Sequence, residues 1–203
     1  MDRKQHWEQV YAQKQPTDVS WFQPHPEYSL RLIAAAGVDK VQPLIDMGGG
    51  ASRLVDNLVA LGYADISVLD ISAAALQHSR DRLGADAAAV HWIEADATAF
   101  EPPRAYALWH DRAVFHFLTD PADRQAYRER LARGLRAGGH LIIATFALDG
   151  PERCSNLPVQ RYSPDTLSAE LGGGYTLVET VTEVHLTPAQ KEQRFVYCRF
   201  VKN

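Results

Sequence analysis

Short apolar segments alternate with amphipathic segments through the middle of the chain. The amphipathic segments repeat their apolar residues every three or four positions, the spacing that predicts helices, whereas the short apolar segments predict buried strands. Such an alternation indicates a doubly wound, mostly parallel sheet with helices on both faces. The predicted strands cover 43–47, 66–69, 90–93, 105–109 and 141–146.

The connecting helices have recognisable ends. Gly62 ends the helix that follows the first strand, and a second helix covers about 73–83. Asp120-Pro121 begins a third helix, because an acid can cap a helix and proline fits its first position. The apolar stripe of that helix, which precedes Gly138-Gly139, consists of Tyr127, Leu131 and Leu135.

The C-terminal part of the chain has a different pattern. A last helix begins at Ser163-Pro164, and two longer segments, 176–184 and 195–201, alternate apolar and polar residues. That alternation predicts an antiparallel hairpin. The expected fold is therefore α/β: a doubly wound, mostly parallel seven-stranded sheet with an antiparallel C-terminal hairpin.

The N-terminal segment precedes this alternation. Trp7, Val10, Tyr11 and Lys14 share one face of a predicted helix. A loop with Trp21 and Phe22 and a helix at about 26–36 follow. We expect residues 1–36 to form a helical lid on a single domain that covers residues 1–203, because no linker interrupts the chain.

Composition excludes several classes of function. The net charge of −4 and the scattered basic residues argue against binding to nucleic acid. No apolar run is long enough to cross a membrane, so we expect a cytoplasmic protein. The two cysteines, Cys154 and Cys198, and the His110–His116 pair lack metal-ligand spacing, so no metal site is expected.

A glycine-rich turn follows the first strand. The sequence from Leu44 to Val55 runs from an apolar strand through Asp46 and three glycines, Gly48, Gly49 and Gly50, into a helix. Glycines let the backbone approach a ligand closely, and the helix start presents free N–H groups to it. A carboxylate at Asp46 disfavours a pyrophosphate and suits a cationic nucleoside. The turn therefore predicts a nucleoside site for a ligand such as S-adenosylmethionine.

Acids recur at the ends of four successive predicted strands. They are Asp46, Asp70, Asp96 and Asp111. In a parallel sheet the carboxyl ends of the strands lie at one edge, where ligands bind. We therefore expect all four carboxylates at that edge.

These residues resemble the pattern of the class I S-adenosylmethionine-dependent methyltransferases. That pattern is an acid-x-Gly-x-Gly turn after the first strand, an acid that ends the second, and an acid after the third. The resemblance implies that Asp46 faces the cationic methionine part and that Asp70 binds the ribose hydroxyls. It further implies that Ile71 packs on the adenine ring and that Asp96, with Ala97, binds the adenine edge.

A narrower resemblance involves the segment from Trp109 to Ala113. It is similar to the Trp-Asp-Arg-Gly segment of the thiopurine and thiol methyltransferases and to the Asp-Lys-Gly segment of some protein-lysine methyltransferases. Here His110 is inserted and Ala113 replaces the glycine. Those relatives also carry an N-terminal Trp-x-x-x-Tyr, matched by Trp7 and Tyr11, which lies over the cofactor. We group Trp7, Tyr11 and His110 with the expected cofactor-binding residues.

Asp111 and Arg112 are the expected catalytic residues. After the fourth strand, Asp111 is placed to orient or deprotonate an acceptor, and Arg112 to pair with a substrate anion; an internal Asp–Arg ion pair is the competing interpretation. Phe115, His116 and Phe117 are candidates for the acceptor pocket, with core packing as the competing interpretation.

The sequence thus favours methyl transfer from S-adenosylmethionine to a small soluble acceptor, with a thiol or related sulfur nucleophile preferred. A lysine of a partner protein is the second candidate acceptor. A nicotinamide-dependent oxidoreductase and a regulator that binds the cofactor without catalysis are hypotheses from two further classes of protein. Against the oxidoreductase, Arg53 occupies the position of the third glycine of a dinucleotide motif.

Overall fold

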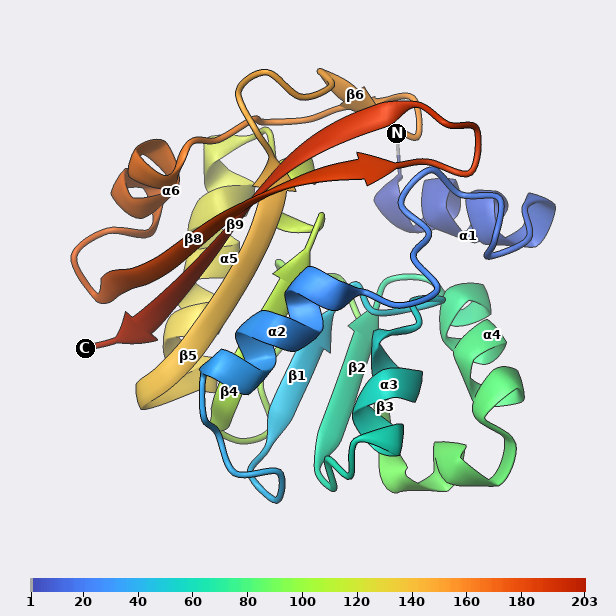
Figure 1. The fold of residues 1–203 in the computed structure, drawn as a ribbon, viewed down its shortest axis with the longest axis horizontal. Helices are drawn as coiled ribbons and strands as arrows, with labels where there is room; N and C mark the ends of the chain where they lie inside the picture. Colours follow the sequence, from blue (N-terminus) through green and yellow to red (C-terminus); the bar gives the residue numbers. More distant parts are fainter. Residues whose placement is uncertain (1) are drawn as a thin grey trace.

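A seven-stranded sheet forms the centre of the protein in a computed structural model that describes residues 2–203. The strand order is β3-β2-β1-β4-β5-β9-β8. The first five strands are parallel, whereas β9 is antiparallel to both β5 and β8, so the C-terminal hairpin closes one side of the sheet (Figure 1). The predicted fold class is confirmed. The strands are β1 (Leu44–Met47), β2 (Ile66–Asp70), β3 (Val90–Glu94), β4 (Tyr106–Arg112), β5 (Leu135–Phe146), β8 (Tyr175–Leu186) and β9 (Glu192–Lys202).

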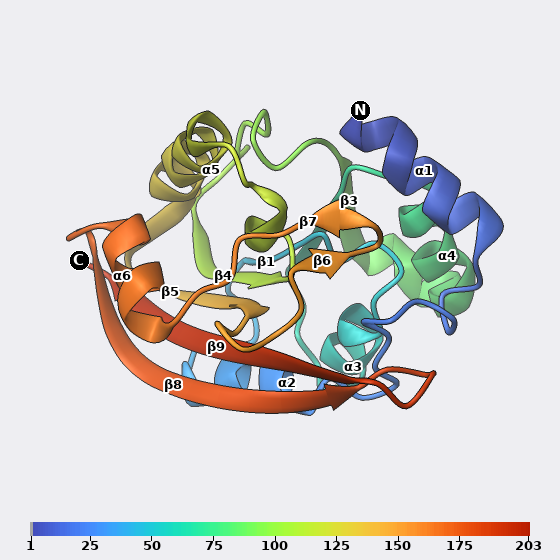
Figure 2. The same cartoon turned by 90° about the horizontal axis from the view of Figure 1, so that it is seen from above.

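Helices cover both faces of this sheet (Figures 1 and 2). One core lies between the sheet and α5 and α6, where Tyr127, Leu131 and Leu167 pack against Ile45. The other core lies between the opposite face and α2, α3 and α4, around Leu44. Adjacent strand residues point to opposite faces, which explains why Leu44 and Ile45 enter different cores. The helices are α1 (Arg3–Gln13), α2 (Glu27–Ala35), α3 (Leu54–Ala60), α4 (Ala73–Leu83), α5 (Pro121–Gly134) and α6 (Pro164–Leu171), with single-turn helices at Gly84–Ala89 and Phe115–Phe117.

Capping residues fix the starts of α5 and α6 as the sequence predicts. The Asp120 carboxylate accepts from the backbone N–H of Ala122. At α6, the side chains of Ser163 and Thr166 each accept a hydrogen bond from the other's backbone N–H, which is a capping box.

Two strand boundaries differ from the prediction. The predicted fourth strand stops at 109, whereas β4 continues to Arg112, because His110 and Asp111 pair with both β1 and β5 and Arg112 pairs with β5. Leu135 does not belong to the α5 stripe; it is the first residue of β5, since α5 ends at Gly134. Pairing with neighbouring strands, which the local pattern does not contain, extends both strands.

Helix α1 lies beside the N-terminal end of α4, above the carboxyl edge of the sheet (Figure 1). The Glu8 carboxylate accepts hydrogen bonds from the N–H of Ala73 at 2.6 Å and from the Ser72 hydroxyl at 3.1 Å. A carboxylate at a helix N-terminus is favoured by the free N–H groups there. Glu8 therefore anchors α1 next to the end of β2.

A small hairpin that the sequence pattern did not predict also lies over this edge. It consists of β6 (Arg153–Cys154) and β7 (Leu157–Pro158), joined by Ser155 and Asn156, both with positive φ (Figure 2).

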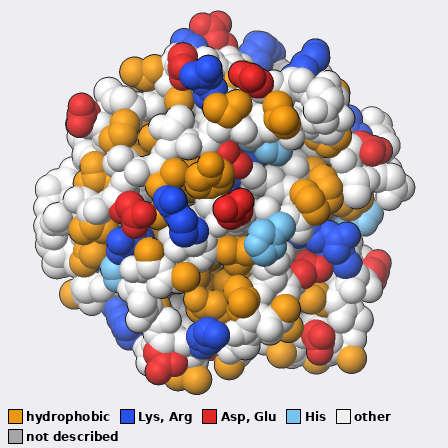
Figure 3. All heavy atoms as spheres, viewed as in Figure 1, with side chains coloured by type: hydrophobic (Ala, Val, Ile, Leu, Met, Phe, Trp, Pro, Cys, Tyr) orange, Lys and Arg blue, Asp and Glu red, His pale blue; other side chains and the backbone are white. Residues whose placement is uncertain are grey.

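Acidic and basic side chains are mixed on the face shown in Figure 3, with no extended basic area. No helix within residues 2–203 combines the length and the apolar character needed to span a bilayer.

Candidate functional site

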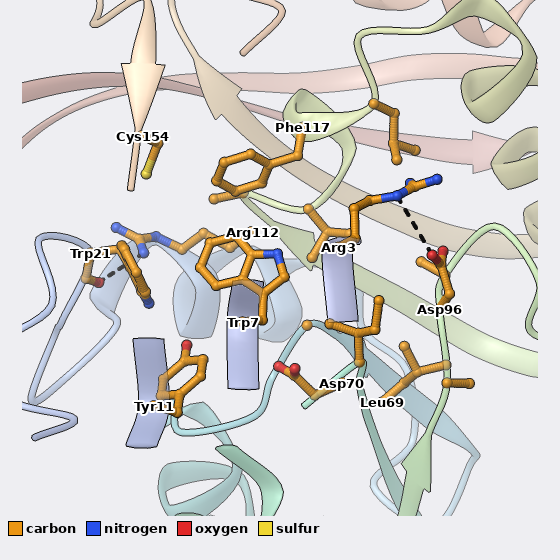
Figure 4. Close-up of a pocket in the computed structure, with 17 residues that line it drawn as sticks. Arg3, Trp7, Tyr11, Trp21, Leu69, Asp70, Asp96, Arg112, Phe117 and Cys154 are labelled. Carbon is orange, nitrogen blue, oxygen red and sulfur yellow. Dashed lines mark hydrogen bonds and ion pairs between the residues drawn. The ribbon is translucent and has the colours of Figure 1, made fainter. Parts of the chain in front are cut away.

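A cavity opens at the carboxyl edge of the sheet, beneath α1. Its walls come from the ends of β1, β2 and β4, from the loop after β3, and from the N-terminal segment and the β6–β7 hairpin. Arg3 and Asp96 lie at one end and Trp21 and Arg112 at the other, with Trp7 and Asp70 between them (Figure 4). The lining residues are Arg3, Trp7, Tyr11, Trp21, Gly48, Leu69, Asp70, Ile71, Ala95, Asp96, Ala97, Arg112, Ala113, Val114, Phe117, Leu118 and Cys154.

The glycine turn supports the floor of this cavity. Gly48 has φ +66°, a left-handed conformation that favours glycine, and it lines the cavity. Gly50 lines neither this cavity nor the second cavity described below. A Cβ there would lie 2.7 Å from the Cβ of Ala75 and would overlap the Asp70 carboxylate. Gly50 therefore makes room for Asp70, which differs from the direct approach to the ligand that we expected of it.

Asp70 is buried at the end of β2 and faces the cavity. Its carboxylate accepts from the backbone N–H of Ser72 at 2.9 Å, and the N–H of Gly50 is a further donor. Burial is the main cause that raises the pKa of Asp70 to about 7, although the two N–H donors oppose it. A carboxylate in this position can accept two hydrogen bonds from a vicinal diol.

Asp96 lies at the far end of the cavity and is fixed by its own loop. One oxygen accepts from the backbone N–H of Thr98 at 2.8 Å and from its hydroxyl at 2.7 Å. The other lies 3.7 Å from Nε of Arg3, which also pairs with Asp123. Ile71 and Ala97 supply apolar wall beside it. This end can hold a flat ring with a polar edge.

Aromatic rings of the N-terminal segment cover the cavity. The centroid of Trp7 lies 5.7 Å from that of Trp21 and 5.1 Å from that of Phe117, and Tyr11 lies 6.4 Å from Trp7. These three rings of the N-terminal segment and the ring of Phe117 all line the cavity.

A second cavity adjoins the first. The two share Tyr11, Trp21, Gly48 and Arg112. Asp46, Gly49 and His110 line only the second cavity. Nδ1 of His110 lies 2.7 Å from Oδ1 of Asp46, its register partner on β1. The structure therefore brings His110 to the same carboxylate that the sequence assigns to the cationic part of the ligand.

Arg112 lies at the junction of the two cavities and is mostly buried. Its Nε donates to the hydroxyl of Tyr197 at 2.8 Å and Nη1 donates to the carbonyl of Trp21 at 3.1 Å. Nη2 lies 3.8 Å from a carboxylate oxygen of Glu183 and has no hydrogen-bond partner within residues 2–203. Arg112 thus brings a positive charge to the junction of the two cavities, while Nη2 itself is enclosed by protein.

Asp111 lies on the other side of the sheet, and its expected catalytic role does not fit this position. It is fully buried and lines neither cavity. Its carboxylate accepts from the N–H of Val114 at 2.9 Å, the N–H of Phe115 at 3.3 Å and the hydroxyl of Tyr127 at 2.6 Å. The competing interpretation, an Asp111–Arg112 ion pair, is also wrong, because neighbours in a strand point to opposite faces.

The three candidates for the acceptor pocket do not all reach the cavity. Phe117 lines the cavity, whereas Phe115 and His116 are fully buried outside its lining. Ala113 has φ +70°, which explains why glycine suits this position in the segments that it resembles.

Sequence reasoning missed Arg3 and Ser29. Arg3 contacts Asp96, and Ser29 contacts His110 in the second cavity. Both contacts join residues more than 80 positions apart, so no local signal reveals them. Within residues 2–203, no cluster of three or more His, Cys, Asp or Glu side chains is arranged to hold a metal ion.

One family of known proteins matches the segment that forms the floor of this cavity. Residues 44–139, which include the glycine turn and the strand-ending acids, match the family described as methyltransferase domain. The chain therefore contains a methyltransferase domain over residues 44–139.

One relative of the enzyme is the eEF1A lysine and N-terminal methyltransferase of Mus musculus. It is 26% identical over 149 residues, which cover 70% of the enzyme. The aligned part spans only 21% of that relative's length.

Solved structures share the fold of the enzyme. One, described as the conversion of a disulfide bond into a thioacetal group during echinomycin biosynthesis, has a TM-score of 0.77 and 19% identity, covering 98% of the enzyme and 91% of that chain. The N-methyltransferase NodS from Bradyrhizobium japonicum WM9, in complex with S-adenosyl-L-homocysteine, has a TM-score of 0.74 and 17% identity, covering 98% and 97%. The glycopeptide N-methyltransferase MtfA, complexed with S-adenosyl-L-methionine, has a TM-score of 0.65 and 16% identity, covering 85% and 92%.

The substitution Gly50→Ala tests the packing beneath Asp70. We expect cofactor affinity to fall about tenfold or more, roughly 1.4 kcal/mol, because the added methyl group displaces the Asp70 carboxylate. Gly62→Ala is the control, since a Cβ at Gly62 meets nothing within 4 Å, although its φ of +82° adds backbone strain. Calorimetric titration with S-adenosyl-L-homocysteine measures both variants. Equal affinities in the two variants would contradict the proposed packing role.

Proposed function

We propose that the enzyme methylates a small soluble acceptor that carries a negative charge, with a thiolate as the preferred nucleophile. The observation that carries this proposal is Arg112, a mostly buried cation that lines both cavities at their junction. Bidentate hydrogen bonding to an oxyanion is the characteristic chemistry of a guanidinium group.

The cofactor leaves little chemistry for the protein to supply. S-adenosylmethionine provides a methyl group already activated by its sulfonium. The residues of the cavity then have to hold the nucleophile in line and exclude water. Asp70, Asp96 and Ile71 are the proposed nucleoside-binding residues, which leaves the end around Arg112 for the acceptor.

The side chains near Arg112 favour an anionic nucleophile. The Glu183 carboxylate beside Arg112 lies outside the lining of both cavities. The residues that line this end, Ala113, Val114, Phe117 and Cys154, carry no carboxylate. A lysine ammonium has to lose a proton before it can attack, and none of these side chains is a base that could accept it. A thiolate needs no such base, and a nearby cation favours the charged form of a thiol.

Cys154 itself is a poor candidate for the methyl acceptor. Burial raises the pKa of its thiol to about 11, so the sulfur stays protonated at neutral pH. The sulfur acceptor that we propose is therefore an external molecule.

The covering of the cavity supports a small acceptor. Trp7, Tyr11 and Trp21 lie over it, and Glu8 anchors the helix that carries two of them. We propose that residues 1–36 act as a lid of the single domain and keep water from the reacting atoms. One of the solved structures with the same fold is described by the conversion of a disulfide bond into a thioacetal group. Its sulfur chemistry is consistent with the proposed thiol acceptor.

The experiment uses methyl-labelled S-adenosylmethionine with a cell extract separated into small molecules and proteins. We expect the label in the small-molecule fraction. Label only in protein would favour a lysine acceptor, as in the name of the mouse relative, and would overturn the small-acceptor proposal.

A matched pair of thiols tests the role of charge. 3-Mercaptopropionic acid and 3-mercaptopropanol differ only in the carboxylate. We expect kcat/KM to be at least tenfold higher for the acid, about 1.4 kcal/mol. Equal values for both thiols would contradict recognition of the anion.

A further inference from the structure

His110 lies between Asp46 and Ser29 in the second cavity. Its Nδ1 lies 2.7 Å from Oδ1 of Asp46, and its Nε2 lies 2.9 Å from Oγ of Ser29. The three residues come from β4, β1 and α2, and their relative exposures are only 2%, 2% and 1%. All three line the second cavity, so the row of hydrogen bonds ends at a ligand-accessible wall.

The hydrogen bonds of this row fix the orientation of the Asp46 carboxylate. An ionised carboxylate only accepts hydrogen bonds, so Nδ1 of His110 carries a proton when Asp46 is charged. Nε2 of a neutral imidazole then accepts from the Ser29 hydroxyl. This arrangement holds the imidazole in one tautomer and keeps the carboxylate in one orientation, as an outer partner does for a metal-bound histidine.

The cavity places charges of both signs close to this row. Arg53 lines the same cavity as Asp46 and does not line the first cavity. A wall with a carboxylate and a guanidinium group matches a zwitterionic α-amino acid, since the carboxylate suits the ammonium group and the guanidinium of Arg53 suits the acid group. The amino-acid end of S-adenosylmethionine has this chemistry.

We propose that Ser29 and His110 are positioning residues that hold Asp46 for the ammonium group of the cofactor's amino-acid end. The inference rests on the cofactor of the enzyme and adds two residues to its binding site. Ser29 belongs to α2, so the row also connects the N-terminal segment to the glycine turn.

Three ligands distinguish positioning from a general structural role. S-adenosyl-L-methionine and S-adenosyl-L-homocysteine carry the amino-acid group, whereas 5′-methylthioadenosine carries the nucleoside without it. Calorimetry measures the affinity of each ligand for the wild type and for Ser29→Ala, Ser29→Thr and His110→Asn. Ser67→Ala is the control, because Ser67 is equally buried and lines neither cavity.

We expect Ser29→Ala and His110→Asn to weaken the two amino-acid ligands about fivefold or more and 5′-methylthioadenosine by less than twofold. Ser29→Thr, which keeps the hydroxyl, restores affinity. If Ser29→Ala weakens all three ligands equally, or none of them while the melting temperature falls, the proposal is overturned. Failure of the wild type to bind any of the three would instead contradict the cofactor itself.

Discussion

Replacing Asp70 with alanine is expected to weaken cofactor binding by about 2–4 kcal/mol, or roughly 30- to 1000-fold. The carboxylate lies in the cavity wall, and its proposed role is to accept hydrogen bonds from both ribose hydroxyls. Alanine removes this acceptor and leaves the hydroxyls without a partner in a site that excludes water. Calorimetric titration with S-adenosyl-L-homocysteine measures the loss.

The same residue predicts how binding depends on pH. Burial raises the pKa of Asp70 to about 7, above its usual 3.8. Between these two pKa values the folded enzyme keeps a proton that the unfolded chain has released. The contribution of protonated Asp70 to the free energy of unfolding is therefore lost as pH rises through about 7. The proposed contact with the ribose requires the ionised carboxylate, so we expect cofactor affinity to increase over the same pH interval.

A suitable control is Asp56→Ala, because Asp56 pairs with Arg82 and lines neither cavity. This variant should bind the cofactor with the wild-type affinity at every pH. A folded Asp70→Ala variant with wild-type affinity would show that Asp70 only caps the turn after β2.

The glycine turn and the strand-ending acids were predictable because each depends on a few consecutive residues. Gly48, for example, has the positive φ that the motif requires, and Asp70 ends its strand as expected. An acid at the carboxyl end of a parallel strand also has to lie at the carboxyl edge of the sheet. This rule is sufficient to bring Asp46, Asp70 and Asp96 to one side of the molecule.

The partners of these residues were not predictable, since they come from distant parts of the chain. Ser29 reaches His110 across 81 positions, and Arg112 reaches Tyr197 across 85. Neither contact has a periodic or compositional signal. Asp111 was misplaced for a different reason: once β4 is known to extend to Arg112, the alternation of strand residues assigns Asp111 and Arg112 to opposite faces.

Asp111→Asn is expected to lower the free energy of unfolding by about 2–4 kcal/mol while cofactor affinity stays within about threefold. Asparagine can still accept from the N–H groups of Val114 and Phe115. Its amide nitrogen, which would replace Oδ2, cannot accept the hydrogen bond that the Tyr127 hydroxyl donates to Asp111. The same hydroxyl accepts a hydrogen bond from Nε1 of Trp109 at 3.0 Å. A buried donor is therefore left without a partner. Thermal and urea denaturation measure the loss.

Arg112→Lys is the counterpart on the opposite face of β4. Lysine keeps a positive charge near Glu183 but lacks the planar pair of N–H donors, so the fold should be retained while binding of an anionic acceptor weakens. We expect the acceptor KM to rise tenfold or more, about 1.4 kcal/mol, with cofactor affinity within about threefold. The two variants should thus affect different quantities. Reduced turnover per folded molecule in Asp111→Asn, with Arg112→Lys unchanged, would return the catalytic role to Asp111 and contradict the acceptor site proposed at Arg112.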